Sequence, residues 1–232
     1  MKIPHCAIVV ASISLISSGA RATAIDISAE APGALLPSVP GASVLAFDAL
    51  PVGELQSYDF AGGTLTGNGA IEDETLPGKF AQPAGDPTRY FTVSHLSAAG
   101  AANLAFSSPK NYFGLYWGSM DSYNAITFLE DGRQIATFSG TVVASLTGLV
   151  ANGDQQSSLS NRYIDFYLTD DFYNEVVLTT SDFGFEIDNI AFSDPPVPIP
   201  EPGTLILLGF SLCLICFGRI GIYENRSIFE TA

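Results

Sequence analysis

The sequence predicts an all-β fold, an antiparallel β-sandwich or jelly roll spanning residues 42–194. Short runs rich in β-branched and aromatic residues are separated by Gly, Pro, Asn and Asp, at a spacing of about eight to twelve residues. Several runs alternate with a period of two: residues 163–168 place Tyr, Asp and Tyr opposite Ile, Phe and Leu. The only candidate helix, residues 144–150, is short and contains Gly148.

The individual strands follow from these runs in chain order. Residues 25–41 hold three prolines and two glycines and are expected to form a loose lead-in. The Gly-rich residues 61–70 and residues 152–161 are expected to be connections at the rims, and Gly132 predicts a hairpin turn at residues 130–133. The expected strands are residues 43–47, 58–60, 90–94, 102–106, 112–117, 125–129, 134–139, 163–168, 175–179 and 184–192.

The N-terminal residues 1–24 have the pattern of a secretory signal peptide. Lys2 precedes an apolar stretch at residues 7–16, and Ala22 and Ala24 supply the small side chains that a signal peptidase recognises. We therefore expect signal peptidase to act on this chain and the mature protein to begin at Ile25.

The C-terminal region combines a stiff linker with an apolar segment. Residues 195–204 contain five prolines, which favour an extended polyproline conformation over a helix or strand. Residues 205–222 are long enough for a transmembrane helix if Arg219 reaches the interface. The basic residues that follow predict a cytoplasmic location for residues 223–232.

The charge of the intervening domain limits its partners. Residues 25–200 carry 21 acidic and five basic side chains, a net charge of −16. Such a field repels nucleic acids and anionic membrane surfaces. The three cysteines, Cys6, Cys213 and Cys216, all lie outside this domain, so its stability must come from its core rather than from disulfides.

Few residues of this domain suit catalysis, and we assign no catalytic residue. Its single histidine, His95, lies in a strand-like run and is read as a packed or surface side chain. A zinc site would need several His or Cys ligands. A carboxylate pair that hydrolyses glycosides stays open as an alternative because acidic residues are abundant. The sequence otherwise predicts a protein that is not an enzyme.

Aromatic residues are concentrated in residues 112–123. One face of this strand must pack in the core, and the other offers rings on which a sugar can stack. The candidate stacking residues are Tyr116, Trp117 and Tyr123, with Asp121 and Asn124 nearby to bond sugar hydroxyls. The alternative is that all these rings serve packing.

Two carboxylates suit calcium. Glu186 and Asp188 alternate along the last expected strand and therefore project from one face, about 7 Å apart. Paired carboxylates with backbone carbonyls can hold Ca²⁺. The alternative is that Asp188 bonds neighbouring backbone groups and fixes the end of the strand. No other cofactor is expected.

The C-terminal residues resemble the PEP-CTERM sorting signal of exported bacterial proteins. The resemblance centres on Pro200, Glu201 and Pro202, followed by the apolar block and Arg219. It implies processing by exosortase, a membrane enzyme resembling a cysteine transpeptidase. One departure is that Arg219 stands almost alone and the chain continues to residue 232, whereas such signals usually end soon after an arginine cluster.

The domain resembles, more loosely, a group of exosortase-dependent surface proteins. The similar segments are residues 112–124, 153–155 and 185–191. The expectation is an exported protein, tethered to the inner membrane by its C-terminal helix and released to the cell surface or extracellular matrix after processing. Binding of carbohydrate, such as an exopolysaccharide, with calcium assisting, is the alternative role.

Overall fold

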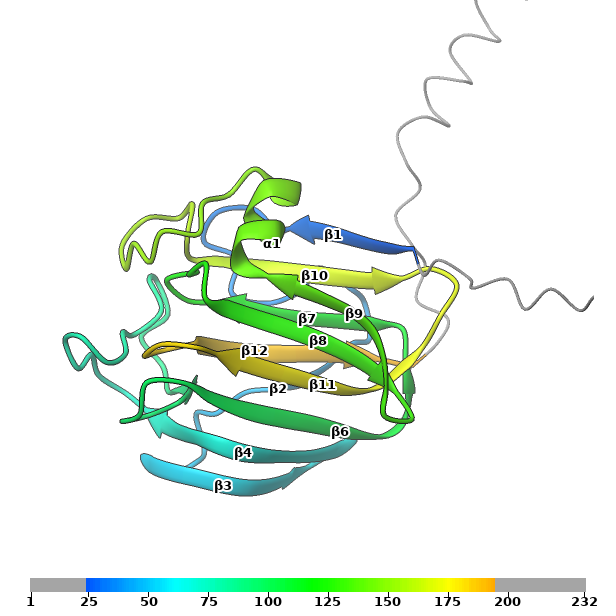
Figure 1. The fold of residues 1–232 in the computed structure, drawn as a ribbon, viewed down its shortest axis with the longest axis horizontal. Helices are drawn as coiled ribbons and strands as arrows, with labels where there is room; N and C mark the ends of the chain where they lie inside the picture. The colour runs from blue at the N-terminus through cyan, green and yellow to red at the C-terminus, as the bar shows by residue number, and fades with distance from the viewer. Residues whose placement is uncertain (1–23, 195–232) are drawn as a thin grey trace, which may run out of the picture.

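The computed structural model describes residues 24–194, which form twelve β-strands and one short helix (Figure 1). The elements are β1 (Ile25–Ala29), β2 (Ser43–Leu45), β3 (Gly53–Phe60), β4 (Gly63–Glu72), β5 (Tyr90–Val93), β6 (Gly100–Lys110), β7 (Tyr112–Trp117), β8 (Asn124–Glu130), β9 (Arg133–Ser139), α1 (Gly140–Thr147), β10 (Arg162–Leu168), β11 (Tyr173–Thr180) and β12 (Glu186–Ser193).

All strand pairs are antiparallel, and they join into a single sheet. The strand order is β1-β10-β7-β12-β5-β4-β6-β11-β8-β9, with β2 on β12 and β3 on β4. The sheet curls at β4, because residues 63–67 pair with β6 whereas residues 69–72 pair with β5. The predicted all-β antiparallel class is confirmed, and its form is one sheet curled into a half-closed barrel (Figure 1).

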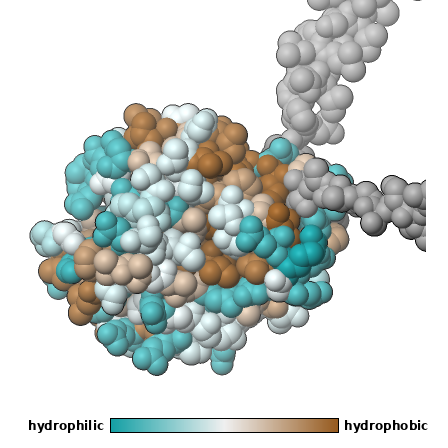
Figure 2. Space-filling model, in the orientation of Figure 1, coloured by the Kyte–Doolittle hydropathy of each residue, from teal (hydrophilic) through white to brown (hydrophobic). Residues whose placement is uncertain are grey.

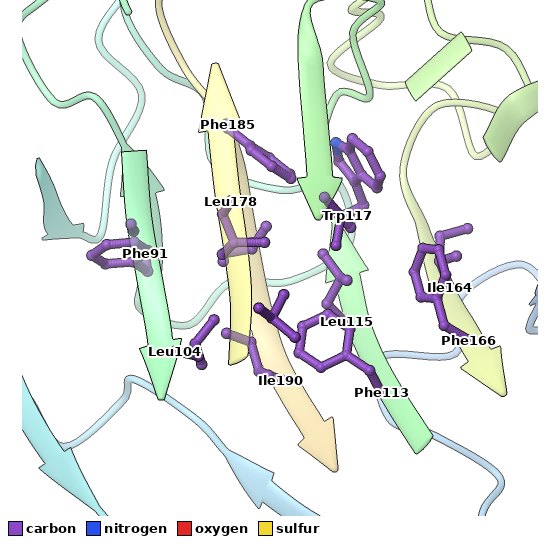
Figure 3. Close-up of a cluster of buried hydrophobic side chains, with 14 of the residues drawn as sticks. Phe91, Leu104, Phe113, Leu115, Trp117, Ile164, Phe166, Leu178, Phe185 and Ile190 are labelled. Carbon is purple, nitrogen blue, oxygen red and sulfur yellow. The ribbon is translucent and has the colours of Figure 1, made fainter. Parts of the chain in front are cut away.

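The main core fills the space between the two halves of this sheet. Phe113 of β7 packs on Phe128 of β8 at 5.7 Å between ring centroids, and Phe106 of β6 packs on Phe192 of β12 at 5.1 Å. Aliphatic side chains such as Leu115 and Ile190 fill the gaps between the rings (Figure 3). Burial of these apolar groups supplies most of the free energy that holds the layers together.

A second, smaller core covers the outer face of β7 and β10. It contains the tyrosines at positions 112, 116, 163 and 167, and residues 35–42 of the lead-in pack against it. The hydroxyl of Tyr112 donates to Asp165 Oδ1 at 2.7 Å, which satisfies a buried carboxylate. The lead-in is therefore not loose as predicted, since it begins as β1 and then forms the lid of this cluster.

The prediction of a rim connection at residues 61–70 is wrong, because these residues form most of β4. The glycines in this segment allow the neighbouring strand to come close to β4. A Cβ atom at Gly63 would lie 2.2 Å from the carbonyl oxygen of Ala105, and one at Gly67 would lie 2.4 Å from that of Ala101. Glycine therefore permits the tight curl of the sheet here. In the sequence, glycines with this role cannot be distinguished from glycines that mark a turn.

The helix α1 begins four residues before the segment predicted for it. Ser139 caps it, accepting a hydrogen bond from Val142 N at 3.3 Å, and Gly148 ends it at φ +74°. The helix contacts β1 and β9, the two ends of the strand order, and so bridges the open seam of the half-barrel (Figure 1). Hydrophobic surface is visible over α1 in Figure 2, where Leu146 is exposed.

The hairpin predicted at residues 130–133 is confirmed. It joins β8 to β9, with Asp131 at φ +49° and Gly132 at φ +77°, as a tight two-residue turn requires. Within residues 24–194, no helix has the length and apolar character needed to cross a membrane. The predicted signal peptide and C-terminal helix lie outside the described residues.

Candidate functional site

Two of the three predicted stacking residues are buried. Tyr116 is 2% exposed and donates its hydroxyl proton to the carbonyl of Ala84 at 2.5 Å. Trp117 is 0% exposed and packs on Phe185 at 4.7 Å between centroids (Figure 3). Neither ring has a free face for a sugar. The prediction fails for these two residues because the core covers one face of β7 and the lead-in covers the other.

Tyr123 occupies a different position, in the lining of a pocket. It is half-buried, donates to Asp121 Oδ2 at 2.7 Å, and its oxygen lies 3.1 Å from the carbonyl oxygen of Phe183. The contact with Asp121 fixes the direction of the phenol ring. Of the predicted stacking residues, Tyr123 is the one placed where a ligand can approach.

The pocket beside Tyr123, here called the rim pocket, has a volume of about 340 Å³. Four connections at one end of the sheet supply its walls: β4–β5, β7–β8, α1–β10 and β11–β12. Its lining residues are Gly78, Lys79, Phe80, Ser119, Asp121, Tyr123, Asn152, Gly153, Gln155, Asp182, Phe183 and Glu186. A site of this size suits one small ligand or one unit of a polymer.

Glu186 forms part of the floor of the rim pocket. Its Oε1 accepts from Ala81 N at 3.0 Å, and its Oε2 accepts from Ser119 Oγ at 2.9 Å. Burial raises the pKa of Glu186 to about 7, although both hydrogen bonds act in the opposite direction. Burial also raises the pKa of Asp121, and the hydrogen bond from Tyr123 opposes it. The floor therefore carries a carboxyl group that changes protonation near neutral pH.

One cation lies among these acids. The ammonium of Lys79 sits 3.3 Å from the centroid of the Phe183 ring, a cation–π contact. Three carboxyl groups, those of Asp121, Asp182 and Glu186, share the pocket with this single ammonium. The pocket thus offers hydrogen-bond acceptors, an aromatic face and a negative field.

Asp188 belongs to a separate buried cluster. It is fully buried, and its Oδ1 accepts from Asn189 N at 2.7 Å while Thr88 Oγ1 donates to Oδ2 at 3.2 Å. Burial, together with the nearby carboxylate of Asp86, raises the pKa of Asp188 to about 8. The hydrogen bond from Asn189 N is a contact with a neighbouring backbone group, which is the role expected for Asp188 if it does not bind calcium.

The predicted calcium pair is not brought together around a shared space. Glu186 bonds Ser119 and Ala81, whereas Asp188 bonds Thr88 and its own neighbour. In residues 24–194, no group of three or more His, Cys, Asp or Glu side chains is arranged to hold a metal ion. A β-bulge follows Asp188, where Asn189 adopts φ +50°, and it shifts the register with β7.

His95 contacts an acidic side chain and an aromatic ring. Its Nε2 lies 3.0 Å from Glu72 Oε1, and its ring lies 5.5 Å from the ring of Phe80. Glu72 is the last residue of β4, which pairs with β5 just before His95, and this pairing could not be predicted from the sequence because β4 was not expected as a strand. The contacts described for His95 orient it toward an acid and an aromatic ring.

Sequence reasoning missed most of the rim pocket. Lys79, Asn152, Gln155, Asp182 and Phe183 come from three separate connections and share no spacing pattern. Tyr123 and Asp121 were identified as part of an aromatic run, and Glu186 was identified as a calcium candidate rather than as a pocket residue. The sequence did place polar and aromatic residues in expected loops, where binding residues are often found. That pattern is too general to predict which of these residues share one pocket.

The residues of the predicted sorting motif, Pro200, Glu201, Pro202 and Arg219, lie outside the described residues. Comparison of the sequence with known families found no matching family model, and comparison with curated proteins found no significant match. The functional assignment therefore depends on the motifs of the chain and on the geometry of the rim pocket.

Proposed function

We propose that this chain is an exported, non-enzymatic protein of the bacterial surface or extracellular matrix, delivered by a PEP-CTERM sorting tail. The observation that carries the proposal is the order of Pro200-Glu201-Pro202, the apolar residues 205–218 and Arg219, in a chain that also begins with a signal-peptide pattern. Exosortase is the proposed processing partner, and the three motif residues act as its substrate.

The limits of the folded domain support this proposal. The first strand begins at Ile25, directly after the expected cleavage point at Ala24, and the last strand ends at Ser193, just before the proline-rich linker. Both proposed cuts therefore fall outside the sheet. The described residues contain no cysteine, so the core rather than disulfides holds this antiparallel β-domain together.

The test is mass spectrometry of the protein from cells with and without active exosortase. We expect an N-terminus at Ile25 in both, and loss of residues 205–232 only where exosortase is active. Glu201→Gln should reduce processing at least tenfold, whereas Glu224→Gln, beyond the apolar block, should leave it unchanged. A mature protein that keeps residues 205–232 despite active exosortase would contradict the proposal.

A second role, carbohydrate binding, is favoured by the rim pocket. Tyr123 is a half-buried residue of its lining, and its hydrogen bond to Asp121 fixes its orientation. A sugar ring stacking on Tyr123 would place its hydroxyls near the side chains of Asn152 and Gln155, which share the pocket. Acidic walls favour neutral or cationic sugars over anionic ones. An exopolysaccharide of such units is the proposed ligand.

Binding of the full chain to neutral and amino-sugar oligosaccharides, measured by calorimetry with and without Ca²⁺, tests this role. Tyr123→Ala should weaken binding at least tenfold by removing the stacking face. Tyr58→Ala, on β3 away from the pocket, is the matched control and should bind normally. Absence of binding to both ligand classes in both buffers would reject this role, and release of reducing ends would indicate a hydrolase instead.

A further inference from the structure

A shallow apolar hollow lies where the described domain ends. It has a volume of about 380 Å³ and is lined by Ser108, Pro109, Phe172 and Asp194. Phe172, in the connection between β10 and β11, is 42% exposed. An exposed aromatic ring next to a proline forms the kind of surface on which polyproline segments dock. The hollow is separate from the rim pocket and shares no residue with it.

Asp194, the last residue that the structure describes, is held at the edge of this hollow. Lys110, which is buried, forms an ion pair with Asp194, and Ser108 Oγ donates to Asp194 Oδ1 at 2.9 Å. These two bonds lower the pKa of Asp194, so its carboxylate stays charged and bound across the neutral range. Asp194 itself lines the hollow, and residue 195 must therefore begin there.

We propose that the proline-rich residues 195–198 of this chain dock in the hollow, with their rings against Phe172 and Pro109. The occupant follows from position and composition: the segment starts at the hollow, and three of its four residues are proline. Proline fixes φ in advance, so docking costs little backbone entropy. At about 3.1 Å per residue, four residues in a polyproline conformation can extend about 12 Å from Asp194.

Tethering favours this segment over other occupants. Residues 195–198 are attached directly to Asp194, so their effective concentration at the hollow reaches the millimolar range. A second copy of the chain, or a separate proline-rich peptide, would have to displace them from solution. These occupants are therefore alternative outcomes of the test.

Docking would give the domain control over the presentation of its own sorting motif. With residues 195–198 held, Pro200 to Pro202 would project from a fixed point on the domain surface rather than from a free tether. This inference deepens the proposed delivery function, yet the docking itself requires no exosortase. The two can therefore fail independently.

Photo-crosslinking of the full chain in detergent micelles tests the docking. Phe172 is replaced by p-benzoylphenylalanine, which keeps an aromatic ring at this exposed position, and crosslinked peptides are mapped by mass spectrometry. We expect intramolecular crosslinks to residues 195–199. The matched control places the same photoreactive residue at Leu146 on α1, which is 61% exposed and should yield no such crosslinks.

A second variant tests the part played by proline. Replacing Pro195, Pro196 and Pro198 by serine in the crosslinking background should lower the yield at least fivefold, because a flexible segment pays more entropy to dock. Unchanged near-ultraviolet circular dichroism would show that the domain stays folded. Crosslinks that are absent, that join two chains, or that persist at full yield in the serine variant would each overturn the proposal.

Discussion

Gly114 shows how a single missing side chain permits the tyrosine cluster on the outer face of β7. A Cβ atom at this position would lie 2.4 Å from the Tyr112 hydroxyl and 2.8 Å from the Tyr163 ring. Both tyrosines are fully buried and hydrogen-bonded, Tyr112 to Asp165 and Tyr163 to the carbonyl of Asn189. Neither ring can move away without breaking such a bond, so the strand requires glycine at this position.

Gly114→Ala should therefore lower the free energy of unfolding by about 1–3 kcal/mol. The measurement is urea unfolding of the full chain, followed by the fluorescence of Trp117, the only tryptophan and a fully buried one. Ala101→Ser, at an exposed position of β6, is the control and should change the value by less than about 0.5 kcal/mol. A Gly114→Ala protein as stable as the parent would show that the tyrosine cluster is readily repacked.

At the scale of elements, the chemistry of the residues explains which strands could be predicted from the sequence and which could not. The limits of β7 were predicted correctly because its dense aromatic pattern has few other interpretations. The strand β4 was missed because the glycines that let it curl look like turn residues. The alternation in β7 and β10 gave the two faces, but it gave no sign that residues 35–42 would cover the tyrosine face. That cover also buries Tyr116, so the prediction that Tyr116 stacks on a sugar was wrong.

The helix α1 also carries a prediction, because it bridges the seam between β1 and β9. Ser139→Ala removes the cap on its first turn and should cost about 1 kcal/mol. Hydrogen exchange of the full chain should then accelerate in α1 and β1 while the central strand β12 keeps its protection. Thr141→Ala, an exposed change within the first turn, should leave exchange unchanged. Equal acceleration in β12 would mean that the cap acts on the whole fold instead.

At the scale of the whole molecule, buried acids set the dependence of stability on pH. Burial raises the pKa of Asp165 to about 6, of Glu186 to about 7 and of Asp188 to about 8, against values near 4 in the unfolded chain. Between about pH 4 and pH 8 the folded protein therefore binds more protons than the unfolded chain. The free energy of unfolding must then decrease as pH rises, because deprotonation favours the unfolded chain.

We expect stability to be greatest near pH 4 to 5 and to fall toward pH 8, by up to about 1.4 kcal/mol per pH unit for each of these groups. The net charge of −16 on residues 25–200 acts in the same direction through self-repulsion. Asp188→Asn should reduce the slope, whereas Asp170→Asn, at an exposed position, should not. Unfolding free energies that rise from pH 5 to pH 8 would show that these carboxyls ionise freely in the folded state.

The pairing of β1 with β10 has a consequence for the timing of folding. Residues 25–29 at the start of the domain pair with residues 164–168, and β2 pairs with β12, the last strand. Contacts so distant along the chain form slowly, because a long loop must close before they are made. In the export that we propose, the leading end would lack its partner strands until nearly the whole domain had crossed the membrane. The topology itself would thus keep the chain unfolded, and competent for threading, throughout its transit.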